Sequence, residues 1–102
     1  MRMKNNTESK IIQIKLRNQM PVLKQQYHVK RLGVFGSVVR GEQKKGSDVD
    51  ILVEFNESVG FFTFLRLEYF LSKTLHKKVD LVSKKAIKSA VKKQIFKEVQ
   101  YV

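Results

Sequence analysis

The sequence of 102 residues contains no cysteine, and this absence excludes several kinds of chemistry. Disulfide frameworks, thiolate nucleophiles, zinc–thiolate sites and iron–sulfur clusters all need cysteine side chains. Long apolar runs are lacking too. No window approaches the ~20 apolar residues of a membrane span, and residues 1–6 lack the apolar stretch of a signal peptide. We therefore expect a cytoplasmic protein that does not bind a membrane.

Acidic residues are scarce as well, and they are unevenly placed. The chain has 21 Lys+Arg against 9 Asp+Glu, which gives a formal charge of +12. Residues 1–31 and 73–98 each carry a net +7, whereas residues 32–72 carry a net −2. An acidic middle between basic flanks is typical of a metal site beside a surface that attracts phosphates. Solvated lysine-rich helix faces would give the same pattern, so charge alone leaves both interpretations open.

Hydrophobic periodicity predicts one small α/β domain over residues 1–102, with helices packed on a short sheet. A helical segment within residues 1–19 comes first, and the core begins at about residue 20. Proline cannot sit mid-helix without removing a backbone hydrogen bond, so Pro21 is expected to separate the first two helices. We expect helices over 8–18, 21–27, 61–75 and 84–97, and strands over 29–35, 50–55 and 78–82.

Three aspartates lie in or beside the predicted strands. Asp48 and Asp50 are two residues apart, so in a strand they project to the same face, and Asp80 joins them if the second and third strands are neighbours. Unpaired carboxylates near a core are costly, and a divalent cation such as Mg²⁺ removes that cost with hard oxygen ligands. The alternative is a strand-edge pair that faces solvent.

A Gly36-Ser37 pair closes the first predicted strand and opens a short segment that we expect to be helical. Glycine lets the backbone approach a ligand closely, the Ser37 hydroxyl can donate to a phosphate oxygen, and Arg40 can pair with a phosphate or an acid. The spacing is neither that of a nucleophile elbow nor that of a Walker loop. A tight turn with a capping serine is the simpler alternative.

The two elements together are far more specific. Gly36-Ser37, ten residues and then Asp48-Val49-Asp50 resembles the nucleotidyltransferase superfamily of DNA polymerase β. More narrowly, the runs LGVFGSVVRGEQKKGSDVDILVEF, KVDLV and IFKEVQYV look like the minimal nucleotidyltransferase (MNT, MntA-like antitoxin) family. The resemblance covers about residues 20–102 and implies a short mixed sheet with helices packed on it.

Family membership would assign the three aspartates to metal binding and catalysis. Asp48 and Asp50 match the two metal-binding aspartates, and Asp80 matches the third carboxylate. The resemblance implies two Mg²⁺ ions and ATP as substrate. It also implies attack of an acceptor hydroxyl on the α-phosphorus, with Asp80 orienting or deprotonating that hydroxyl.

The same resemblance makes Gly36 and Ser37 the pair that holds phosphates, and it gives Arg40 a phosphate contact or a role in local structure. Val38 and Val39 depart from the family, which frequently has Arg or Tyr and then Ala there. His76 stands where many relatives carry glycine, which we interpret as a local difference in a turn.

Family members are similar to antitoxins encoded beside HEPN-domain ribonuclease toxins, which they inactivate by transferring AMP to a toxin tyrosine. A small chain has little left beyond a catalytic core to shape an acceptor pocket, so an acceptor carried by a partner protein fits best. The aromatic-rich helix over 61–75 serves either as core or as a docking face. Three alternatives stay open: a binding-only antitoxin, a nucleotidyltransferase acting on a small molecule or RNA, and a basic nucleic-acid-binding module, which no known motif favours.

Overall fold

The computed structural model describes residues 7–44 and 46–102. Residues 1–6 and Lys45, which the predicted domain includes, lie outside the described residues. The elements in chain order are α1 (Thr7–Tyr27), β1 (Val29–Phe35), α2 (Ser37–Arg40), β2 (Val49–Phe55), α3 (Phe61–Leu75), β3 (Val79–Ser83), the 3₁₀ turn η1 (Lys84–Ala86), α4 (Ser89–Glu98) and β4 (Gln100–Tyr101). The mixed α/β architecture predicted from the sequence is confirmed.

The four strands form one mixed sheet in the order β3-β2-β1-β4. β1 pairs antiparallel with both β2 and β4, while β2 and β3 run parallel. A parallel pair needs a crossover connection, and α3 supplies it. The parallel pairing places residues 49–53 of β2 beside residues 79–83 of β3, so the two predicted aspartate-bearing strands are neighbours.

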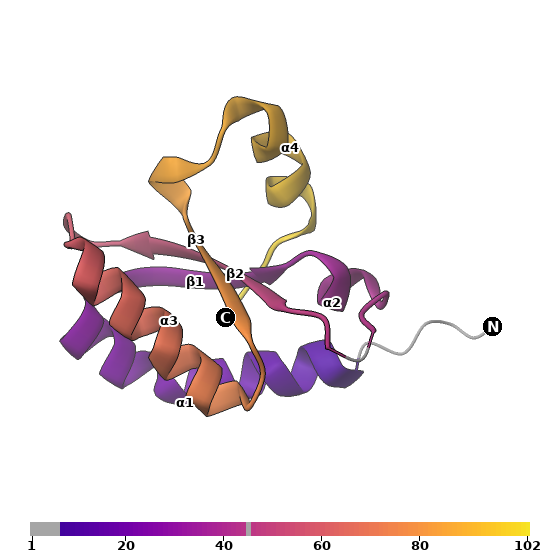
Figure 1. The fold of residues 1–102 in the computed structure, drawn as a ribbon, viewed down its shortest axis with the longest axis horizontal. Helices are drawn as coiled ribbons and strands as arrows, with labels where there is room; N and C mark the ends of the chain where they lie inside the picture. Colours follow the sequence, from indigo (N-terminus) through magenta and orange to yellow (C-terminus); the bar gives the residue numbers. More distant parts are fainter. Residues whose placement is uncertain (1–6, 45) are drawn as a thin grey trace.

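The two faces of the sheet are covered differently. Figure 1 shows α1 and α3 lying together across one face, while α4 stands on the other side. Alternating strand residues, such as Ile51 and Val53 of β2, pack in the main core on the α1–α3 side. The intervening residues point the other way, where Leu52 joins Phe35 and Ile95 in a second, smaller cluster. By the same alternation Asp50 faces the α4 side.

The predicted break at Pro21 is wrong, because α1 runs without interruption from Thr7 to Tyr27. Leu16 and Leu23 are fully buried on either side of the proline, whereas Pro21 itself lies on the exposed face. The residue whose carbonyl loses its partner, Arg17, is also exposed, so water can replace the missing N–H. Burial of one apolar face therefore outweighs the local cost of proline.

The C-terminal region also differs from the sequence prediction. The single helix expected over 84–97 is divided into η1 and α4, and β4 was not predicted. The remaining strands agree within one residue at each end, and α3 has the predicted bounds. Within the described residues, no helix combines the length and the apolar character needed to cross a bilayer.

Candidate active site

Asp50 and Asp80 lie side by side on the α4 face of the sheet. They are register partners in the parallel β2–β3 pair, so their side chains leave the sheet in the same direction. Both line a cavity of about 480 Å³ between the sheet and α4, together with Gly36, Arg40 and Glu98. The structure thus brings residues from β1, α2, β2, β3 and α4 to one place.

The electrostatics of Asp50 are those of a partly buried, crowded carboxylate. Burial, which is the largest cause, and the negative charges of Asp80 and Asp48 together raise its pKa from 3.8 to about 6. Arg40 opposes this shift, and Glu98 adds to it. The basic side chains of the protein therefore neutralise the charges of these carboxylates only in part.

Asp48 precedes β2 and lines a neighbouring cavity of about 230 Å³, beside Ser47 and Lys77. Its charge still acts on Asp50, as the pKa of Asp50 shows. Among the residues that the structure describes, no three His, Cys, Asp or Glu side chains are grouped so as to hold a metal ion. The structure therefore brings Asp50 and Asp80 together, and a metal centre with all three aspartates stays a prediction.

The donor set nevertheless fits a magnesium ion that is shared with a substrate. Mg²⁺ usually binds one or two protein carboxylates and completes its shell with water and substrate phosphates. Asp50 and Asp80 supply two such carboxylates in one cavity. The raised pKa of Asp50 is the mark of a carboxylate that a nearby cation would stabilise in its charged form.

Gly36 lies against Asp50 so closely that no other residue fits there. Its φ of +83° is in the region that favours glycine, and a Cβ added at this position would collide with the Asp50 carboxylate. Gly36 also stands at the N-terminus of α2, whose last residue is Arg40. The close approach of this backbone to a ligand stays a prediction, and its neighbour in the structure is the aspartate of the adjacent strand.

The polar groups of this turn are held by Glu98, which the sequence prediction missed. The Gly36 N–H donates to Glu98 Oε2 at 2.7 Å, and Arg40 Nη1 donates to Glu98 Oε1 at 2.9 Å. Arg40 Nε also donates to Glu42 Oε1 at 3.0 Å. Of the two roles predicted for Arg40, these contacts favour the one in local structure, and its phosphate contact stays a prediction. A signal was available, because Glu98 is the only acid among six lysines in residues 84–98.

The residues after Gly36 divide into a partly exposed serine and two buried valines. Ser37 is half-buried at the first position of α2. Val38 and Val39 are 2% and 8% exposed and belong to the main core. The departure from the family at these two positions thus supplies apolar packing, and Ser37 remains the candidate phosphate donor of this segment.

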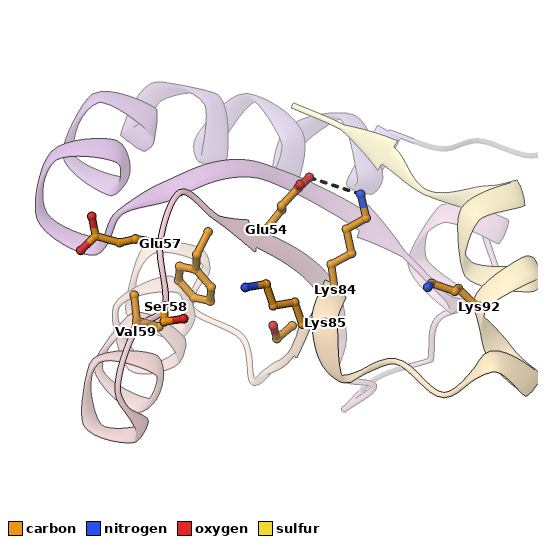
Figure 2. Close-up of a pocket in the computed structure, with 9 residues that line it drawn as sticks. Glu54, Glu57, Ser58, Val59, Lys84, Lys85 and Lys92 are labelled. Atoms are coloured by element: carbon orange, nitrogen blue, oxygen red, sulfur yellow. Dashed lines mark ion pairs between the residues drawn. The ribbon is translucent and has the colours of Figure 1, made fainter.

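A further cavity of about 390 Å³ lies at the opposite end of β2 and β3, away from the aspartates. Figure 2 shows Glu54 next to Lys84 and Lys85, with Glu57 at one end and Lys92 at the other. Lys84 Nζ pairs with Glu54 Oε1 at 3.5 Å. Because its walls carry both signs of charge, this cavity favours no single class of ligand.

In this mixed sheet a Gly-Ser turn lies against an Asp-x-Asp strand, and the parallel neighbouring strand carries a further aspartate. This arrangement is typical of enzymes that transfer nucleotides. The chain belongs to the nucleotidyltransferase domain family, whose model matches residues 16–102. The resemblance stated from the sequence is thereby confirmed.

Individual relatives agree with this assignment. The protein adenylyltransferase MntA of Thermococcus cleftensis is 48% identical over 80 residues, which are 78% of this chain and 81% of the relative. A solved structure assigned as a minimal nucleotidyltransferase superposes with a TM-score of 0.72 at 30% identity, covering 96% of this chain and 95% of the other. A solved structure of the toxin–antitoxin MntA–HepT, in a variant in which a tyrosine is replaced by alanine, gives a TM-score of 0.65 at 26% identity. The match covers 93% of this chain and 70% of the other.

Proposed function

We propose that this enzyme transfers AMP from ATP to a hydroxyl group on a partner protein, and that the partner is a HEPN-domain toxin whose tyrosine receives the AMP. The observation that carries the proposal is the cavity that Asp50, Asp80 and Gly36 line together, with Ser37 directly after Gly36 in the chain. The relatives add support, since one is a protein adenylyltransferase and another is the antitoxin of a toxin–antitoxin pair.

We assign the metal to the aspartates and the triphosphate to the turn. Asp50 and Asp80 would hold Mg²⁺, with Asp48 as a further ligand on the neighbouring side. When bound, Mg²⁺ would neutralise charge on the triphosphate and polarise the α-phosphate of the AMP group that is transferred. The Gly36 N–H donates to Glu98, so we assign to Gly36 only the close approach of the backbone to the triphosphate. Ser37 provides the hydroxyl that donates to a phosphate oxygen.

The reaction follows from this placement. The acceptor oxygen forms a bond to the α-phosphorus of ATP, the bond from that phosphorus to the β-phosphate bridging oxygen breaks, and pyrophosphate leaves. Asp80 is exposed at the mouth of the site, where it can receive the acceptor proton or orient the hydroxyl. Asp50 is less exposed than Asp80 and lies against Gly36, so we assign it to metal binding.

The partner's contact with the enzyme has a candidate surface on α3. Phe64 and Phe70 pack against the core, as expected of a buried helix face. Phe61, Phe62 and Tyr69 are instead exposed by 69%, 71% and 66%, so the helix is both core and apolar surface. Exposed aromatic residues of this kind are typical of protein interfaces.

The test is intact-mass spectrometry of the partner toxin after incubation with the enzyme, ATP and Mg²⁺. We expect one or more AMP additions to the toxin, and none with Asp48→Asn/Asp50→Asn. A toxin that is silenced without any mass change would show a binding-only antitoxin. An equal adduct with the double variant would contradict the site assignment.

A further inference from the structure

Glu98 is the last residue of α4, and its side chain reaches across to the turn after β1. The Glu98 side chain is only 15% exposed. Oε2 accepts the Gly36 N–H at 2.7 Å, and Arg40 Nη1 lies 2.9 Å from Oε1 and 3.1 Å from Oε2. One carboxylate therefore binds the residue at the start of α2 and the residue at its end.

Glu98 lies near other carboxylates, whose negative charges oppose its own. Glu98 lines the same cavity as Asp50 and Asp80, and its charge adds to the repulsion acting on Asp50. A third carboxylate in this cavity does not relieve the repulsion between Asp50 and Asp80. Its short hydrogen bonds, which are the charge-assisted kind, instead fix the two groups that it binds.

Gly36 connects the hydrogen bonds of Glu98 to the predicted active site. The turn touches the Asp50 carboxylate so closely that a Cβ does not fit between them. A small displacement of Gly36 would change the space around Asp50 and the direction of Ser37, which follows directly. The amide that Glu98 holds therefore belongs to the residue that lies against Asp50 and directly precedes Ser37.

We propose that Glu98 is a positioning residue for the nucleoside triphosphate. It holds the Gly36 amide and Arg40 from α4, and so keeps the Gly36–Ser37 turn and Asp50 in the geometry that binds the metal-bound triphosphate. The inference rests on the proposed nucleotide site, and it makes the docking of α4 a condition for tight nucleotide binding.

The experiment compares Glu98→Ala, Glu98→Gln and a matched control, Glu42→Gln, in the full chain. The Glu42 side chain also accepts a hydrogen bond from Arg40, whereas the Gly36 N–H donates to Glu98. Glutamine at position 98 keeps an oxygen acceptor for the Gly36 N–H, whereas alanine removes it. The probe is a non-hydrolysable ATP analogue with Mg²⁺, measured by titration calorimetry, and the second readout is the amide proton shift of Gly36 by NMR.

We expect Glu98→Ala to weaken binding of the analogue by about tenfold or more, as for loss of one charge-assisted hydrogen bond. The Gly36 amide should move upfield in the same variant. Glu98→Gln should retain most of the affinity for the analogue and most of the wild-type Gly36 amide shift. Glu42→Gln should leave the affinity and the amide shift unchanged. If Glu98→Ala does not fold, Glu98→Asp keeps the charge but has a shorter reach, and it should show the same loss of affinity.

A moved Gly36 amide with unchanged affinity would overturn the proposal, as would equal losses in Glu98→Ala and Glu42→Gln. A wild-type protein that binds no analogue with Mg²⁺ would overturn both this role and the proposed function. Nucleotide binding that depends on Glu98, without AMP transfer to the partner, would overturn the proposed function alone.

Discussion

Gly36 and Gly46 both have a positive φ, but only Gly36 lies against a side chain of another element. A Cβ at Gly36 would collide with Asp50, whereas at Gly46 it would meet nothing within 4 Å. We predict that Gly46→Ala costs about 1–2 kcal/mol from backbone strain alone. Gly36→Ala should cost more in urea unfolding and should abolish nucleotide binding. Equal losses in the two variants would show that the contact with Asp50 has no energetic weight.

The raised pKa of Asp50 gives a prediction for stability against pH. Between 3.8 and about 6 the folded protein binds more protons than the unfolded chain, so stability falls as the pH rises through this range. The shift corresponds to about 3 kcal/mol, which solvent screening at this half-exposed site reduces to about 1 kcal/mol.

Asp50→Asn should therefore unfold about 4–8 °C higher than wild type at pH 7.5 without metal. At pH 4 the two proteins should unfold at similar temperatures. Differential scanning calorimetry at both pH values checks this, and adding Mg²⁺ should stabilise only the wild type. An Asn variant that is less stable at pH 7.5 would contradict the account of the acidic cluster.

Gly36, Asp50 and Asp80 could be selected from the sequence as site candidates, because each lies in or beside a predicted strand and belongs to a short motif. Glu98 could not be predicted in the same way. Its partner Gly36 is 62 positions away, and the contact depends on how α4 folds back over the sheet. A lone acid in a lysine-rich segment marks a residue of interest, but it does not identify the partner.

At the scale of the elements, α1 shows how tertiary packing overrides a local rule. The position of Pro21 predicted two helices. The structure has one continuous helix, which burial of Leu16 and Leu23 stabilises. We predict that Pro21→Ala stabilises the protein by about 1–3 kcal/mol, because it restores a hydrogen bond on the exposed face. Urea unfolding measures the change, and a destabilised variant would mean that proline shapes α1.

The end of α3 gives a second prediction of this kind. His76 caps the helix with a φ of 55°, a left-handed conformation in which glycine has no steric cost. The family resemblance leads us to expect glycine at this position, where it would adopt the left-handed conformation freely. His76→Gly should raise stability by about 1 kcal/mol in thermal unfolding. A lower unfolding temperature would show that the imidazole makes a compensating contact.

The element that escaped prediction altogether is β4. Its two residues, Gln100 and Tyr101, are too short for any periodic pattern, and they become a strand only by pairing with Val34 and Gly33 of β1. The longer strands were predictable because each buries apolar residues on at least one face. The length of a strand thus limits what its own sequence reveals.

At the scale of the whole molecule, the acidic cluster is an exception within a chain of net charge +12. The sheet gathers the carboxylates on the α4 side, while the two long helices cover the other side (Figure 1). The family and the site class could be predicted from the spacing of two short motifs. The arrangement of the aspartates could not, because it depends on the parallel pairing of β2 with β3.

The most direct measurement is titration calorimetry of a non-hydrolysable ATP analogue into the wild type and Asp80→Asn, each with and without Mg²⁺. Asp80 is exposed, so its substitution should leave the fold intact. The account predicts binding to the wild type only when Mg²⁺ is present, and at least tenfold weaker binding to the variant (about 1.4 kcal/mol). Binding of equal strength without the metal, or by Asp80→Asn, would contradict it.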